Sequence, residues 1–364
     1  MQLLMGYAIY LASIIVGLFK KNSKALAFVI LIAMWLIMGF NSYNEDMLPY
    51  KYFYDLQLTE GSGLYLGYVA TEQFAWQLGF DYYQYRMLFS GISLLLIFRF
   101  IVRYTDNPAL VLALYALLPF MYDVVQFKFF LSASVAITGL SFLIDNKKFA
   151  VPAFCCFLLI AILFHPASAL FSIFMISKLS KKRALVLSIV LALIILLSVY
   201  SGYAQMVMSG LMDSTKASVY LSELGRFGSL PYLVSTLLLV VLSVYVQNEI
   251  SFHERRIEEG TVCPLPSGNK FLEFFKSGVF AFIPLVALLP VSLQNFYRPI
   301  RSSLLLFYLF FAITAFEHRD YLSQRSRSLF ILSFIIWVLL TFYTVMYGVY
   351  DIVIAAELAN NLLW

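Results

Sequence analysis

Two arginines late in the sequence have a spacing that suits a diphosphate. Arg298 and Arg301 stand in the stretch LQNFYRPIRSS, where a helix is predicted to begin. Residues three apart on a helix share a face, so the two guanidinium groups can point to one ligand. Each guanidinium offers a planar fork of N–H donors, and two neighbouring forks match a diphosphate. The pair therefore predicts recognition of a phosphorylated substrate.

Other charged side chains are predicted to lie on the same side of a membrane as this pair. Lysine and arginine are scarce on the outer side of membrane proteins, so cations there are candidates for neutralising a phosphate. The alternative for each is a side chain that pairs with a carboxylate or reaches the headgroups from the end of a span. The charged and titratable residues predicted on this side, cations and carboxylates together, are Asp46, Arg86, Asp123, Lys128, His165, Arg226, Arg298 and Arg301.

The composition requires membrane helices to position these residues. The chain is 62% hydrophobic and 12% charged, with a mean hydropathy of +0.85, and a water-soluble domain could not shield so much apolar surface. We expect an all-α polytopic integral membrane protein. A span takes roughly 20 helical residues, and about twelve transmembrane helices are predicted, at residues 2–19, 25–40, 85–102, 108–122, 127–144, 149–164, 167–178, 184–200, 229–247, 271–291, 301–316 and 328–347.

The charge distribution predicts the topology. Because Pro166 lacks a backbone donor and His165 interrupts the apolar run, residues 149–178 are predicted to form two short helices; one long kinked helix would invert every later span. With two helices, the basic connections alternate, and the positive-inside rule makes them cytoplasmic. Both termini are then outside. The cytoplasmic set contains KKNSK (20–24), Arg99, Arg103, Lys147, Lys148, KLSKKR (178–183), Arg255, Arg256, Lys270, Arg319, Arg325 and Arg327.

The domain organisation follows from this topology. We expect a single transmembrane domain over residues 1–364, with the outer loops 41–84, 201–228 and 292–300 forming the active-site face and residues 248–270 forming a cytoplasmic loop. Within the first outer loop, the segment LYLGYVATEQFAWQLGF is too polar to span and is predicted to be an interfacial helix on the outer face.

Several classes of chemistry are excluded by what the sequence lacks. It has no glycine-rich phosphate loop, no Walker lysine and no HExxH motif, and its three histidines cannot build a conventional zinc site alone. An ATP-driven pump is therefore disfavoured, and we expect neither a metal nor another cofactor. The net charge of +5 is explained by the cytoplasmic loops, so no nucleic-acid partner is expected.

The order of four segments resembles a known family. YNEDMLPYKYF follows the second span, FKFFLSASVAI opens a span with a cation, LIAILFHPASAL places a histidine near an outer helix end, and FYRPIRSSLLLFY comes late in the chain. In this order and spacing, over roughly residues 35–320, the chain resembles the EpsG/Wzy-like family of bacterial exopolysaccharide and O-antigen polymerases.

The resemblance implies a fold and a reaction. The fold would be GT-C-like, in the bacterial plasma (inner) membrane, and the substrate would be an undecaprenyl-diphosphate-linked oligosaccharide. A growing glycan would be transferred from undecaprenyl diphosphate to the next lipid-linked repeat unit at the outer face. Besides membrane lipids, a chain-length regulator and a flippase are the implied partners.

The resemblance also gives the charged residues roles. A base must take the proton of the attacking hydroxyl, and Asp46 and His165 are the two candidates. Lys128, Arg226, Arg86 and the arginine pair are the candidate ligands of the leaving diphosphate. Tyr50, with its aromatic neighbours, offers a flat face to sugar C–H surfaces. The alternative for the Asp46 segment is an ordinary aromatic belt with solvated acids.

Two other classes remain open from the sequence. A lipid-linked oligosaccharide flippase or other twelve-helix carrier would have the same number of spans, although we find no internal repeat and the unusual charges gather at one membrane face. An O-antigen ligase or a membrane acyltransferase is the second alternative; the acyltransferase would need a histidine with a partner, and His165 supplies only the first.

Overall fold

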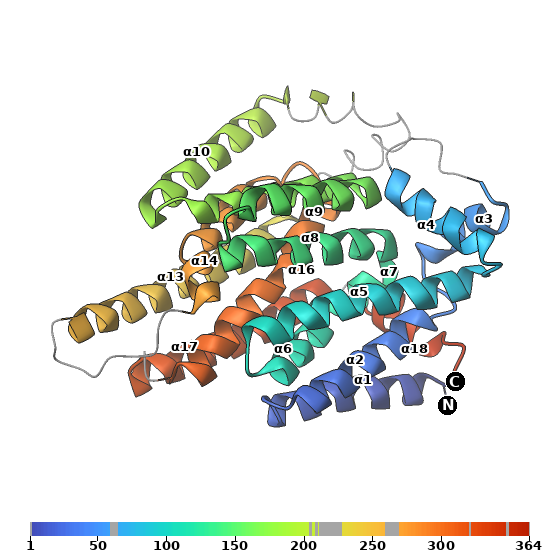
Figure 1. Ribbon diagram of the computed structural model, residues 1–364, viewed down its shortest axis with the longest axis horizontal. Coiled ribbons are helices and arrows are strands. Elements are labelled where there is room, and N and C mark those ends of the chain that lie inside the picture. Colours follow the sequence, from blue (N-terminus) through green and yellow to red (C-terminus); the bar gives the residue numbers. More distant parts are fainter. Residues whose placement is uncertain are drawn as a thin grey trace.

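The chain folds as a helical bundle in which long helices pack side by side (Figure 1). The computed structural model describes residues 2–58, 65–203, 206–207, 210, 228–258, 269–319, 322–346 and 349–363. The elements are α1 (Gln2–Phe19), α2 (Lys24–Gly39), α3 (Met47–Asp55), α4 (Leu66–Gln77), α5 (Tyr82–Tyr104), α6 (Pro108–Tyr115), η1 (Ala116–Phe120), α7 (Met121–Val125), α8 (Phe127–Asp145), α9 (Ala150–Phe164), η2 (Pro166–Lys178), α10 (Lys181–Tyr200), α13 (Leu230–Glu258), α14 (Lys270–Gly278), η3 (Val279–Ala281), α15 (Phe282–Ala287), α16 (Leu293–Ala312), η4 (Ile313–Glu317), α17 (Gln324–Met346), η6 (Asp351–Ala355) and α18 (Ala356–Ala359).

The helix lengths confirm a polytopic, all-α membrane protein. Within the described residues, seven helices are long and apolar enough to cross a membrane, namely Tyr82–Tyr104, Pro108–Val125, Phe127–Asp145, Lys181–Tyr200, Leu230–Phe252, Leu293–Glu317 and Gln324–Val345. Four shorter apolar helices are Leu3–Phe19, Lys24–Gly39, Ala150–Phe164 and Pro166–Lys178. The predicted span 271–291 is divided among α14, η3 and α15, where Pro284 cannot donate to the preceding turn. The total of twelve spans stays a prediction.

The chain reverses direction at His165. Its backbone is extended (φ −155°, ψ 121°), as the position before a proline favours, so α9 ends at Phe164 and η2 begins at Pro166. Two contacts with α8 give the directions: Ser132 Oγ donates to the Ala161 carbonyl at 2.5 Å, and Lys178 Nζ donates to the Leu143 carbonyl at 2.7 Å. Helix α9 therefore runs against α8 and η2 runs along it, as the two-helix interpretation of this segment predicts.

One end of the bundle, called the site end below, gathers α3, α4 and the C-terminal helix α18 (Figure 1). Asn41, after α2, donates from Nδ2 to the Asn360 carbonyl at 3.0 Å. Tyr122 of α7 donates to the Val345 carbonyl near the end of α17 at 2.7 Å. The start of α1 joins them, since the hydroxyls of Tyr7 and Tyr350 are in contact.

The opposite end, called the far end, gathers connections that are rich in lysine and arginine. The Ala109 N–H donates to the Lys21 carbonyl at 3.1 Å, which joins the α1–α2 turn to the start of α6. Lys178 donates to Asn146 Oδ1 at 2.7 Å, and Lys181 donates to Asn248 Oδ1 at 2.8 Å. These are the connections that the positive-inside rule assigns to the cytoplasm.

A break between helices α6 and α7 shapes the interior near the site end. Leu118, which precedes Pro119, is extended (φ −158°, ψ 118°) and interrupts the helix between α6 and α7. Tyrosine hydroxyls satisfy the carbonyls that the break releases: Tyr308 donates to the Leu118 carbonyl at 2.5 Å, and Tyr10 donates to the Ala116 carbonyl at 3.1 Å. The break is thus fixed by side chains from α1 and α16.

The predicted loops agree with the structure only in part. The segment predicted as an interfacial helix forms helix α4, and Gly67 of α4 packs against the backbone of Leu163. Its place at the membrane interface stays a prediction. Helix α13 continues to Glu258, so the first part of the loop predicted at 248–270 is helical, and residues 259–268 lie outside the described residues. Most of the predicted loop 201–228, including Arg226, lies outside the described residues.

Candidate active site

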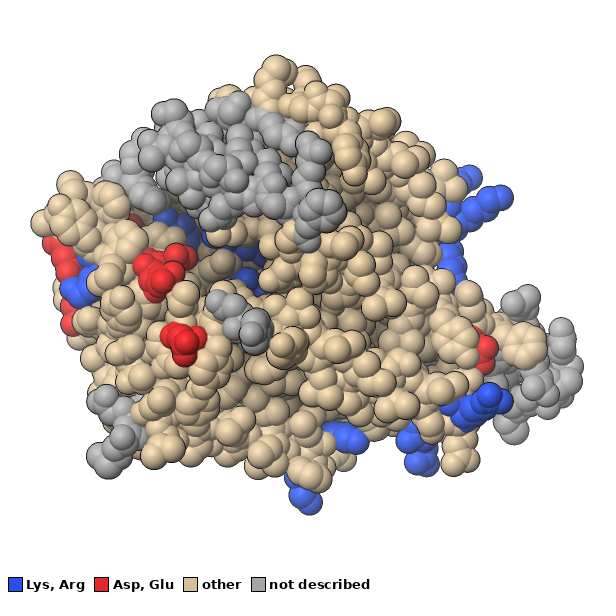
Figure 2. All heavy atoms as spheres, turned by 180° about the vertical axis from the view of Figure 1, so that it is seen from behind, with Lys and Arg blue, Asp and Glu red and all other residues tan. Residues whose placement is uncertain are grey.

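Four of the predicted residues meet at the site end, although they come from distant parts of the sequence. Asp46 directly precedes α3, Lys128 lies in the first turn of α8, His165 separates α9 from η2, and Arg298 lies in the second turn of α16. In the space-filling view, lysine and arginine side chains lie inside a recess at this end beside a group of acidic side chains (Figure 2). Elsewhere on that face, lysine and arginine project from the surface.

Lys128 is buried beneath three tyrosines. It is 3% exposed, and its ammonium lies 4.6 Å from the ring centroid of Tyr50, 4.2 Å from that of Tyr65 and 4.4 Å from that of Tyr68. A cation over the face of an aromatic ring is stabilised by the ring quadrupole, and this contact is strengthened where water is excluded. The predicted aromatic residue Tyr50 therefore helps to hold a positive charge inside the site.

His165 contacts both the aromatic wall and an arginine. Its ring centroid lies 5.6 Å from that of Tyr65 and 5.3 Å from that of Phe129, and its Nε2 lies 3.5 Å from Arg298 Nη1. Burial, together with the charges of Arg298 and Lys128, lowers the pKa of the imidazole to about 3. His165 is therefore a neutral side chain at physiological pH.

Asp46 is half-buried and faces the same cations. Its carboxylate does not cap α3. Burial raises the pKa of Asp46; Arg298, Lys128 and Arg86 oppose this rise, while Glu45 adds to it. A carboxylate whose pKa is raised binds a proton more tightly, which suits a general base near neutral pH.

A cluster of aromatic side chains fixes α3 and thus Asp46. Tyr54 donates its hydroxyl to the Phe80 carbonyl at 2.8 Å, and its ring stacks on Tyr85 of α5 at 5.3 Å between centroids. The other charges of this helix face away: Lys51 and Asp55 form an ion pair with side chains 32% and 45% exposed.

The predicted arginine pair is divided between two environments. Arg301 is 2% exposed, donates from Nη2 to Gln126 Oε1 at 2.7 Å and lies 3.7 Å from Asp123 Oδ1. Its guanidinium covers the ring of Tyr122 at 4.5 Å. Arg298 instead reaches His165. The spacing of the two arginines predicts that both guanidinium groups bind one ligand. In the structure, contacts with Asp123, Gln126 and Tyr122 hold Arg301 within the protein.

Arg86 is enclosed completely and binds backbone groups. Its Nε donates to the Met38 carbonyl at 3.0 Å and its Nη2 to the Val124 carbonyl at 2.6 Å, with the Phe127 ring 5.1 Å away. Carbonyls near the ends of helices α2 and α7 lack intrahelical partners and attract cations. Arg86 therefore ties two helix ends together under the site.

Two parts of this arrangement are absent from the sequence prediction. Tyr65 forms the wall between Lys128 and His165, and nothing distinguishes it from its aromatic neighbours in the sequence. Glu357 of α18 is buried completely, and neither of its carboxylate oxygens has a hydrogen-bond partner within the described residues. An acid within an apolar C-terminal segment is the signal that could have identified Glu357.

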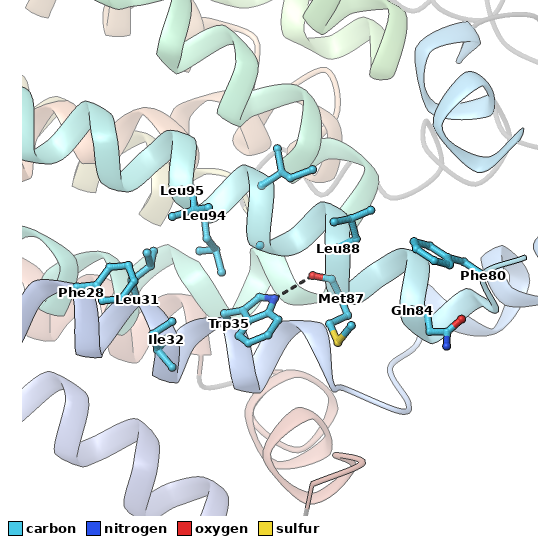
Figure 3. Close-up of a pocket in the computed structure, with 12 residues that line it drawn as sticks. Phe28, Leu31, Ile32, Trp35, Phe80, Gln84, Met87, Leu88, Leu94 and Leu95 are labelled. Carbon is cyan, nitrogen blue, oxygen red and sulfur yellow. Dashed lines mark hydrogen bonds between the residues drawn. The ribbon is translucent and has the colours of Figure 1, made fainter. Parts of the chain in front are cut away.

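An apolar groove opens between α2 and α5, away from these charges (Figure 3). It has a volume of about 470 Å³, and Trp35, whose Nε1 donates to the Met87 carbonyl at 2.9 Å, lies at its centre. Gly91 gives this indole room, since an added Cβ would lie 3.0 Å from Trp35 Nε1. Phe80 and Gln84 line the end of the groove nearer α3, where Tyr54 of α3 binds the Phe80 carbonyl. The groove offers apolar contact and a single amide.

These features define a class of protein. The described residues form a polytopic helical membrane protein whose buried cations, half-buried carboxylate and neutral imidazole meet at one end, and they contain no group of three His, Cys, Asp or Glu that could hold a metal ion. The model of the EpsG family matches residues 24–356, so the chain belongs to the EpsG family, a Wzy-like polymerase family of polysaccharide-synthesising membrane proteins. The match ends at residue 356, one residue before Glu357. No curated protein and no solved structure matched the chain.

Proposed function

We propose that this protein is a polysaccharide polymerase that transfers a growing glycan from undecaprenyl diphosphate to the next lipid-linked repeat unit at the outer face of the plasma membrane. The observation that carries the proposal is the meeting of Asp46, Lys128, His165 and Arg298 at one end of the bundle. A base and several cations are the groups that such a transfer needs.

The reaction distributes charge in a way that matches these groups. The hydroxyl oxygen of the acceptor sugar attacks the anomeric carbon of the donor glycan, and a new C–O bond forms. The bond from that carbon to the diphosphate oxygen breaks, and its electron pair leaves with undecaprenyl diphosphate. The hydroxyl proton passes to a base, for which Asp46 and His165 are the candidates, while fixed cations stabilise the leaving diphosphate.

The groove between α2 and α5 suits the lipid part of the same substrate. The end of the groove that Phe80 lines adjoins α3 through the hydrogen bond from Tyr54 to the Phe80 carbonyl. Its lining of leucine, isoleucine, phenylalanine and tryptophan offers contact to one polyprenyl chain with almost no polar requirement. We therefore assign the polyprenyl chain of a lipid-linked substrate to this groove.

The charges of the far end support the orientation with the site end outside. Cysteines introduced at Asp46 or Asn295, in a chain whose native cysteines are replaced, should react with an impermeant thiol reagent in intact cells. A cysteine introduced at Lys182 should stay unlabelled. Labelling at Lys182 with protection at Asp46 would place the site on the cytoplasmic side and contradict the proposal.

A carrier is the main competing function, and a reconstituted reaction separates the two. Purified protein in detergent should convert a lipid-linked repeat unit into longer lipid-linked oligomers without nucleotide, metal or membrane potential, because the sugar–diphosphate bond supplies the free energy. Formation of oligomers with wild type but not with Asp46→Asn is the expected result. A protein that leaves the substrate unchanged in detergent yet moves it across vesicle bilayers would be a flippase.

A further inference from the structure

The hydrogen bonds of His165 assign a role to each of its ring nitrogens. The Ala167 backbone N–H donates to His165 Nδ1 at 3.2 Å, which caps the start of η2. A backbone N–H can only donate, so Nδ1 must carry a lone pair and no proton. In a neutral imidazole the proton then lies on Nε2. His165 therefore presents an N–H donor, not a lone pair, on its other side.

That donor faces a second donor. Arg298 Nη1 lies 3.5 Å from His165 Nε2, at the limit of hydrogen-bond length, and a guanidinium has no acceptor. Arg298 Nε is buried and has no hydrogen-bond partner within the described residues. Two N–H groups that converge without an acceptor between them make a site for a negatively charged oxygen, which can accept from both.

The surroundings favour an anion at this point. The Lys128 ammonium lies over Tyr65, the same ring that contacts His165. The Phe129 ring stands nearly perpendicular to the imidazole and packs against it. Asp46 is a carboxylate that shares the field of Arg298 and Lys128.

We propose that His165 Nε2–H and the Arg298 guanidinium together bind one phosphate oxygen of the lipid diphosphate, so that His165 is an anion ligand and not the general base. This assignment rests on the proposed function for the identity of the ligand, and it leaves Asp46 as the base. A neutral histidine that donates keeps its proton throughout the reaction, and the charge that develops on the leaving diphosphate is shared with Arg298.

Two amide variants test the assignment because each retains one of the two ring functions. In His165→Asn the amide lies near the position of Nδ1 and can still cap η2, but the far donor is lost. In His165→Gln an N–H donor lies near the position of Nε2, and no group remains that can act as a base. We expect His165→Gln to polymerise within about tenfold of wild type, because one neutral donor replaces another. We expect His165→Asn and His165→Ala to lose about 100-fold or more.

Binding provides a readout that does not depend on polymerisation. The chain has three histidines, so ¹⁵N-histidine NMR of the protein in detergent gives few signals, and the signal that His165→Gln removes belongs to His165. We expect the Nε2–H tautomer, unchanged between pH 5.5 and 8. Farnesyl diphosphate should shift this N–H resonance, and Arg298→Gln should weaken the binding. Inorganic pyrophosphate as a second probe separates recognition of the headgroup from recognition of the lipid.

The outcomes separate this inference from the proposed function. Three results would each overturn the anion-ligand role, even if wild type polymerises. The first is a proton on Nδ1, and the second is the absence of a shift of the N–H resonance with either diphosphate. The third is a His165→Gln protein that binds diphosphate but is as inactive as His165→Ala. A shift with diphosphate in a wild-type protein that forms no oligomers would retain the anion site and reject the polymerase.

Discussion

The cations at the two ends of the bundle differ in how they are held. At the site end, Arg86, Lys128 and Arg301 are at most 3% exposed and lie against aromatic rings. At the far end, the Arg103 side chain is 41% exposed and pairs with Asp145, and Lys181 binds an amide in an exposed setting. Burying a charge is costly unless it is paired or hydrogen-bonded. The exposed cations of the far end carry little of this cost, whereas the site end keeps its cations in spite of it.

The largest effect that this comparison predicts is on catalysis through Asp46. Asp46→Asn keeps the shape of the side chain but removes the base, and polymer formation should fall by about 100- to 10,000-fold. Asp55→Asn on the same helix is the matched control, because Asp55 is exposed and paired with Lys51. The readout is oligomer formation by purified protein. Equal activity of the two variants would show that the site end holds its charges for another reason.

The second prediction separates a structural from a ligand-binding role for Arg301. Arg301→Met leaves Asp123 buried without its cation and should lower the free energy of unfolding by about 3–5 kcal/mol. The matched far-end change, Arg103→Met, should lower it by less than about 1 kcal/mol, because that pair is partly solvated. Thermal unfolding in detergent, followed by tryptophan fluorescence, compares the two.

The double variant Arg301→Met with Asp123→Leu completes this test. Replacing both partners by apolar side chains removes the uncompensated charge and should restore most of the stability. If Arg301 only supports the site, the double variant should also polymerise. A stable but inactive double variant would show that Arg301 binds the diphosphate, as its spacing from Arg298 suggests.

The contrast between these two arginines shows what the sequence can and cannot predict. Apolar length predicts most of the helices, and the proline rule predicts the reversal at His165, because both depend on local chemistry. The direction of Arg301 depends on Asp123 and Gln126, which come from other elements. The electrostatic effect of Arg298 on Asp46 likewise depends on the tertiary fold. Spacing in the sequence could therefore identify each residue as a candidate but could not predict which of them lie together.

The same limit applies to the segment 271–291. Its apolar content predicts a span, yet the structure divides it among three short helices because Pro284 interrupts the hydrogen-bond pattern. For Lys128, the sequence predicts a cation among aromatic residues. It does not predict that three tyrosines meet around the ammonium. Tyr50 lies in α3, Tyr68 lies in α4, and Tyr65 directly precedes α4.

The third prediction uses pH to compare the two candidate bases. Asp46 acts in its deprotonated form, so the rate should rise with pH through the pKa of Asp46 and then level off, falling about tenfold per pH unit on the acid side. Because burial raises this pKa, the acid limb should lie above the range of an ordinary aspartate. His165, with a pKa lowered to about 3, should add no limb between pH 5 and 8.

Two variants check the origin of the acid limb. Lys128→Met removes a cation that opposes the rise in the Asp46 pKa, so the limb should move to higher pH. His165→Gln replaces one neutral side chain by another and should leave the midpoint where it is. A midpoint that disappears in His165→Gln would make His165 the titrating base.

The smallest predicted effect concerns the apolar groove, which lies apart from both sets of charges. Ile92 lines it and is 45% exposed, so Ile92→Trp should fill part of the space beside Trp35 without touching the cations of the site end. A polyprenyl chain bound there would lose contact area, and we expect KM for the lipid-linked repeat unit to rise about three- to tenfold with kcat unchanged. Leu339→Trp on α17, at a residue that is 60% exposed and outside the groove, is the matched control. A KM that rises equally in both variants would show a general effect of surface tryptophan, and a fall in kcat with Ile92→Trp alone would mean that the groove, like the charged recess, takes part in the chemical step.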